Sequence, residues 1–276
     1  MIGIAYDAEV NRALCIGLCW LFVVCSAPSS ARAAKPDQTF EDAQRAYHQK
    51  NYGRALKQLQ AFLRAVPKDD ARRFGAVEQV ARIHLQFRRD PEAATAFLEK
   101  VKKTAKFSKE NRDDVEQWLA TAREWKKMGG LTGTDNADDL FRRGVRYYRR
   151  GIADTEGPGD ETGAASRYIA ASYLVPFVVN YDGDQRIAQA LLMLGDIHRR
   201  SWKDDQWWTV DFYLKEVIRR FPASPEAKRA YRILDEDIRM RWSGSSGDMT
   251  PGYLKTMLKR YKARAYGTDK AKTSSK

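Results

Sequence analysis

The sequence predicts an all-α fold: an α-solenoid of antiparallel helix pairs, about four of them, with extra helices. Apolar residues recur every three or four positions along most of the chain, which is the period of an amphipathic helix. The segment 56–67 ends in proline, and near-copies of it recur three times downstream. Glycine and proline are clustered where short turns would join helices. Repeated helix pairs bury their apolar faces against one another, so we expect a binding surface rather than a catalytic cleft.

Residues 1–33 are predicted to be a secretory signal peptide. Arg12 precedes an apolar run over 13–24, and small residues surround Arg32 in the pattern of a cleavage site. Cleavage is therefore expected between Ala33 and Ala34. The apolar run is shorter than the roughly 20 residues of a membrane-spanning helix.

Two alternatives to cleavage remain open. The segment could be retained as a membrane anchor, or a lipid could be attached at Cys25. The bulky Val24 stands where bacterial lipoprotein signals carry a small residue, which disfavours lipid attachment.

The positions of the cysteines and the net charge exclude some kinds of site and indicate the class of partner. All three cysteines lie inside the predicted signal, so the mature chain would have no disulfide, no cysteine zinc site and no thiol nucleophile. The net charge of +13 is unchanged by cleavage, because the signal contains two cations and two anions. A basic surface attracts anions. For an exported chain this favours acidic proteins, anionic lipid or envelope polymers, and no nucleic-acid partner is expected.

The first predicted block spans 34–128. One helix pair begins near Thr39 and ends at Pro67, with a turn around Asn51. A second pair occupies about 71–104 and restarts at Asp90, which precedes a proline as helix caps often do. A single helix follows over about 109–127, with two tryptophans on its apolar side.

A glycine-rich linker at 129–137 is predicted to separate this block from a second one, at 138–243. The second block contains the third and fourth pairs and a further helix capped by Ser224. Beyond it we expect a loop and short helix at 244–264, then a disordered basic tail at 265–276.

Small residues, aromatic residues and prolines lie at matching positions of several pairs. They are Ala43, Tyr52, Ala55, Leu59, Phe62 and Pro67 in the first, Ala170, Leu174, Phe177 and Tyr181 in the third, and Gly195, Leu214, Phe221 and Pro222 in the fourth. On these positions, most of 38–242 resembles tetratricopeptide repeats, whose units pair two helices in about 34 residues. The pair endings resemble exported bacterial members of that family, those of outer-membrane barrel assembly and of Tol–Pal-associated envelope coordination. The resemblance implies a scaffold for protein–protein interactions in the cell envelope, periplasmic or associated with the outer membrane.

Two groups of side chains are candidates for partner binding. Arginines recur on the first helices of the second block, which line the concave face in the family that the chain resembles, and tryptophans flank an insertion at 201–206. The candidates are Arg142, Arg146, Arg149, Arg150, Arg199, Trp202, Trp207 and Trp208. The alternative interpretations are a solvated charged face and aromatic filling between pairs. The expected partners are other envelope proteins or acidic peptides.

No catalytic or metal-binding pattern stands out, so the chain is not expected to be an enzyme or to hold a cofactor. His84 and His198 occupy matching positions of first helices and are expected to line the core. Two alternative functions stay open: an accessory of a cell-wall-active enzyme, and a membrane-surface protein whose basic tail contacts anionic lipid or cell wall.

Overall fold

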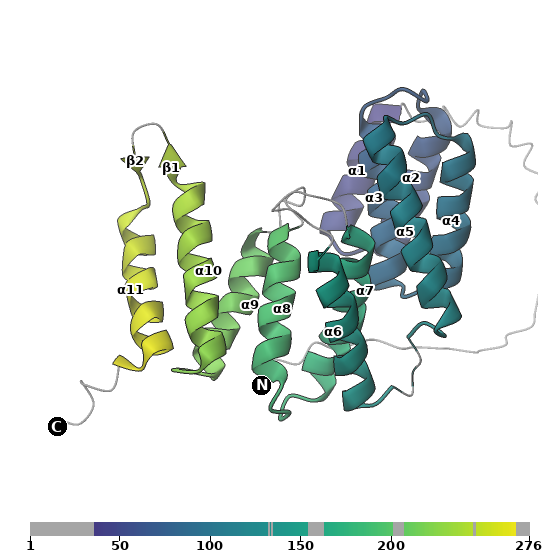
Figure 1. Ribbon diagram of the computed structural model, residues 1–276. Helices are drawn as coiled ribbons and strands as arrows, with labels where there is room; N and C mark the ends of the chain where they lie inside the picture. The colour runs from purple at the N-terminus through teal and green to yellow at the C-terminus, as the bar shows by residue number, and fades with distance from the viewer. Residues whose placement is uncertain are drawn as a thin grey trace, which may run out of the picture. The chain divides into compact units, whose positions relative to one another are not determined.

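The computed structural model describes residues 36–131, 133, 135–153, 163–200, 207–244 and 247–268, with the side chains of Trp207 and Trp208 left out. The predicted signal and its cleavage site at Ala33 and Ala34, Trp202 and the tail from 269 lie outside these residues. The all-α prediction is confirmed: the described part of the chain contains eleven α-helices and a single two-stranded hairpin (Figure 1).

The helices follow one another along the chain. They are α1 (Pro36–His48), α2 (Tyr52–Ala65), α3 (Arg72–Arg82), α4 (Pro91–Thr104), α5 (Lys109–Lys127), α6 (Ala137–Ala153), α7 (Ala164–Asn180), α8 (Ile187–Arg200), α9 (Trp207–Arg220), α10 (Pro225–Arg241) and α11 (Gly252–Tyr266). A π-helical turn, η1 (Ile83–Phe87), continues α3, and the strands β1 (Ser243–Gly244) and β2 (Gly247–Asp248) join α10 to α11.

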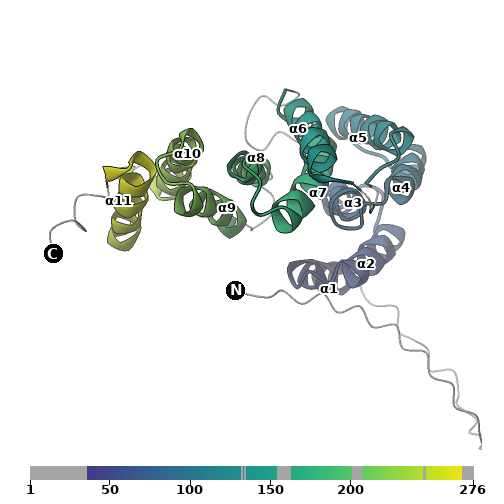
Figure 2. The ribbon, with the colours of Figure 1, turned by 90° about the horizontal axis from the view of Figure 1, so that it is seen from below.

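Most helices pack against their neighbours in sequence. The closest pairs are α1 with α2, α4 with α5, α6 with α7, and α8 with α9, and α10 packs against both α9 and α11 (Figures 1 and 2). In addition to α6, α7 contacts α5, η1 and α8, so it joins helices that precede and follow it in the chain.

Polar residues begin several of these helices as the sequence predicts. The side chain of Asp90 accepts a hydrogen bond from the Ala93 amide, and that of Ser224 accepts one from the Ala227 amide. Asn51, where we expected a turn, is the cap of α2. The first helix begins at Pro36, three residues before Thr39, and proline suits a first helical turn because it has no amide to leave unpaired.

Two arginines make the same set of contacts at two places in the chain. Arg72 binds both carboxylate oxygens of Asp70 and reaches Asp37 on α1, and its guanidinium lies over the rings of Phe40 and Phe62. The second arginine, Arg186, repeats every one of these contacts with Asp184, Asp138, Phe141 and Phe177. Each arginine holds a helix pair to the beginning of the next helix.

A close helix approach is also repeated. A Cβ added at Gly144 of α6 would lie 2.6 Å from a methyl carbon of Leu174 on α7. A Cβ added at Gly195 of α8 would lie 2.9 Å from a methyl carbon of Leu214 on α9. In both pairs the neighbouring residue is a tyrosine whose Cβ is the next contact. Because glycine has no side chain, the backbone of one helix can contact the leucine side chain of the other helix of the pair.

Side chains of helices that precede and follow the predicted linker in the chain hold its glycine residues. Gly129 and Gly130 end α5 with φ of +82° and +63°, a region that glycine enters without strain. The carbonyl of Gly130 accepts hydrogen bonds from the Tyr173 hydroxyl at 2.8 Å and from Arg143 at 3.0 Å. The same hydroxyl accepts a bond from the buried indole of Trp125. Helices from either side of the linker therefore share one buried joint.

Of the two histidines predicted to line the core, His84 is buried and His198 is only partly buried. His84 is 5% exposed, and His198 is half-buried and stacks on Tyr213 at 5.4 Å between ring centres. Burial, with a smaller contribution from Arg82, lowers the pKa of His198 to about 3. Burial also lowers the pKa of His84. Both side chains are therefore neutral near pH 7.

These lowered pKa values predict a loss of stability in weak acid. The unfolded chain binds protons on its histidines below about pH 6.5, whereas the folded chain resists that protonation, so stability is full above this pH and declines below it. For His198 we expect the free energy of unfolding to fall by roughly 1–2 kcal/mol between pH 7 and pH 5, with a further loss of the same sign from His84. Urea unfolding at the two pH values measures this loss.

A matched variant isolates the histidine contribution. His198→Gln should lose less stability than the natural chain between pH 7 and pH 5. Carboxylates such as Asp184, whose pKa Arg186 lowers to about 2, titrate below that range and should not contribute. An identical pH dependence in the variant would contradict the assignment.

Candidate partner-binding surface

Helix α6 buries only a narrow stripe of residues and carries arginines on its other faces. Its buried residues are Leu140, Gly144, Tyr147 and Gly151, which follow one another at helical spacing on the side that packs against α7. Between 137 and 153 the helix carries five arginines and only two aspartates. The two glycines bring α7 close, and the long arginine side chains occupy the faces away from the buried stripe.

Three of the predicted arginines line one open hollow on α6. Arg142, Arg146 and Arg149, with Phe141 and Val145, line a space of about 400 Å³ along α6. Arg142 and Arg146 are well exposed, with 75% and 59% of their side chains accessible. A hollow that combines two apolar side chains with three guanidinium groups suits a ligand that has both a carboxylate and an apolar group.

The ion pairs of these arginines are incomplete. Arg142 pairs with Asp139 on its own helix, while Arg146 and Arg150 share the carboxylate of Glu124 on α5, with Arg146 at 2.9 Å. No ion pair is found for Arg149 within the described ranges. A single carboxylate from a neighbouring helix thus faces several cations, which leaves net positive charge at the hollow.

Two predicted arginines lie elsewhere. Arg150 faces α5 through its bond to Glu124. Arg199 joins α8 to α10, with its Nε donating to Asp237 at 2.7 Å and a terminal nitrogen 3.1 Å from Glu236. Burial raises the pKa of Asp237, and Arg199 opposes that rise. This geometry favours a structural role for Arg199.

The structure does not describe the side chains of the predicted tryptophans. Trp202 and the side chains of Trp207 and Trp208 lie outside the described residues, although α9 begins at Trp207. Exposed apolar side chains occur instead at the β1–β2 end of α10 and α11, a grouping that the sequence analysis missed. They are Met240, Trp242, Met249 and Tyr253. Their positions on either side of a Gly-Ser loop are the signal that could have revealed them.

The described residues carry no sign of a metal site or of a transmembrane helix. No three histidine, cysteine, aspartate or glutamate side chains gather there in a way that could hold an ion. None of the described helices combines the length and hydropathy needed to span a bilayer. Comparison with family models, curated proteins and solved structures finds no match to this chain.

Proposed function

We propose that the protein is a non-enzymatic adaptor, built as a tetratricopeptide-like solenoid, that docks an acidic segment of a partner protein on α6. The observation that carries the proposal is the hollow lined by Arg142, Arg146 and Arg149 beside Phe141 and Val145. The repeated arginine contacts and the repeated glycine–leucine approaches support a fold made of similar helix pairs. The apolar run before Ala33 supports export to the periplasm or outer membrane, where the partner would be another envelope protein.

Docking would use both the arginines and the apolar side chains of the hollow. A carboxylate of the partner binds Arg149, which has no ion pair to give up within the described part of the chain, and a guanidinium can bind two carboxylate oxygens at once. An apolar side chain next to that carboxylate covers Val145 and Phe141. Arg146 gains a second carboxylate only by sharing or releasing Glu124, so that residue limits the affinity.

The net charge makes the encounter sensitive to salt. A chain of +13 attracts an acidic segment over about 8–10 Å at physiological ionic strength. Raising the salt concentration should therefore slow association more than it speeds dissociation.

The test is binding of a labelled peptide of alternating glutamate and leucine to the whole chain. Fluorescence anisotropy should show saturable binding, and the double variant Arg146→Glu with Arg149→Glu should weaken it by at least about tenfold. A peptide with lysine in place of glutamate should not bind.

The double variant Arg54→Glu with Lys57→Glu is the matched control, because both are exposed cations of α2 that do not line the hollow. Its effect should stay within about twofold. Equal weakening by the control and by the α6 double variant would show that general charge, and not this hollow, binds the peptide.

A further inference from the structure

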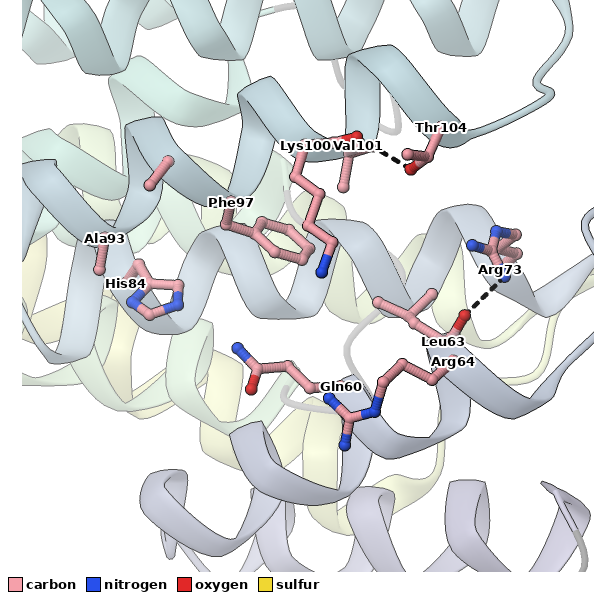
Figure 3. A pocket seen from close by; sticks show the side chains of 11 residues that line it. Gln60, Leu63, Arg64, Arg73, His84, Ala93, Phe97, Lys100, Val101 and Thr104 are labelled. Atoms are coloured by element: carbon pink, nitrogen blue, oxygen red, sulfur yellow. Dashed lines mark hydrogen bonds between the residues drawn. The ribbon is translucent and has the colours of Figure 1, made fainter.

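A second hollow lies between α2, α4 and the α3–η1 segment (Figure 3). Its volume is about 430 Å³, within the range of pockets that hold small molecules. The residues that line it are Gln60, Leu63, Arg64, Arg73, His84, Ala93, Ala96, Phe97, Lys100, Val101 and Thr104. None of them carries a carboxylate, and none belongs to the α6 surface.

One wall of this hollow is apolar. Leu63 from α2 and Phe97 and Val101 from α4 contribute most of it, and the ring of Phe97 lies near its middle (Figure 3). Both α2 and α4 contact η1, which contributes His84 to the lining. An alkyl chain placed here would replace water against these side chains, which is favourable.

Cations from two helices face each other across the space. Lys100 extends from α4 and Arg64 from α2 toward the same region (Figure 3). No ion pair is found for either side chain in the part of the chain that the structure describes. At one end, Arg73 donates to the Leu63 carbonyl at 2.8 Å, and its Nε is buried without a hydrogen-bond partner.

A buried polar atom at the other end lacks a partner. His84 is 95% buried, its ring lies beside Ala93 (Figure 3), and its Nδ1 makes no hydrogen bond. Buried polar atoms without partners are rare in folded proteins, and this one makes the His84 end of the hollow polar. The neutral ring can donate or accept one hydrogen bond.

We propose that this hollow binds an amphiphilic monocarboxylate, a single alkyl chain that ends in one carboxylate. The carboxylate lies between Arg64 and Lys100, and the chain lies against Phe97, Val101 and Leu63. Two unpaired cations select a negative head group, and the apolar wall selects the alkyl tail.

The test is isothermal titration of the whole chain with decanoate, below the concentration at which decanoate self-associates. We expect saturable binding at one site, at least about tenfold tighter than binding of 1-decanol, which has the same chain without the charge. The cation decyltrimethylammonium should not bind. Equal affinity for decanoate and 1-decanol, or no binding of decanoate, overturns the proposal.

Variants locate the site. Arg64→Glu combined with Lys100→Glu should weaken decanoate binding by at least about tenfold, while Lys103→Glu, an exposed lysine of the same helix outside the hollow, should change it by less than about twofold. If the double charge reversal unfolds the chain, Arg64→Gln combined with Lys100→Gln replaces it. Unchanged binding in a folded double variant overturns the assignment.

The two sites can be told apart. Arg146→Glu with Arg149→Glu should leave decanoate binding unchanged, because neither residue lines the second hollow. If the glutamate–leucine peptide displaces decanoate, the hollow belongs to the peptide surface and a separate carboxylate site is wrong.

Discussion

Trp125→Ala is expected to lower the free energy of unfolding by about 3–5 kcal/mol, the range measured for removal of large aromatic side chains from cores. The indole is fully buried, and its Nε1 donates to the Tyr173 hydroxyl at 2.8 Å. That hydroxyl in turn donates to the Gly130 carbonyl. The substitution therefore leaves a cavity and removes one bond from the joint that ties the segment after α5 to α7.

An exposed tryptophan provides the matched control. Trp242 is 42% exposed after α10, so Trp242→Ala should cost less than about 1 kcal/mol. Urea unfolding followed by circular dichroism measures both variants. Similar losses for the two would contradict the proposed joint between α5, α7 and Gly130.

Gly144→Ala should destabilise the chain by roughly 1–3 kcal/mol, which is the usual cost of overpacking a close contact. The new methyl group would lie 2.6 and 2.8 Å from two carbons of Leu174, so this buried side chain or α6 itself must shift. The arginine hollow is on α6, and the affinity for the glutamate–leucine peptide should fall as well.

Substitution of a second helical glycine is expected to change stability in the opposite direction. Gly75 lies within α3, and a Cβ added there meets no atom within 4 Å. Gly75→Ala should therefore stabilise the chain by about 0.5–1 kcal/mol, because alanine favours the helix. Thermal unfolding of the two variants in parallel compares them. Stabilisation by Gly144→Ala would contradict the close approach of α6 and α7.

The helices were predictable from local pattern, and the contacts between them were not. Asp90 and Ser224 act as caps because a cap involves residues only three positions apart. The contacts of Arg186 were missed because its partner Asp138 lies 48 residues earlier in the chain. Nothing in the local sequence distinguishes that aspartate from one that caps a helix.

The site was predictable only in part for the same reason. Arg146 and Arg199 look alike in sequence, since both stand among other arginines of a helix. The structure separates them because Arg199 meets Asp237 of α10, whereas Arg146 stays 59% exposed beside Arg149. The second hollow had no local signal at all, because Phe97 and His84 each fit the pattern of an ordinary core position.

Hydrogen–deuterium exchange of the whole chain, with and without the glutamate–leucine peptide, tests the proposed docking surface most directly. Bound peptide should slow exchange of backbone amides in α6, above all between 141 and 150, and leave α10 and α11 unchanged. Protection confined to other helices, or no protection of α6 at saturating peptide, would contradict the account.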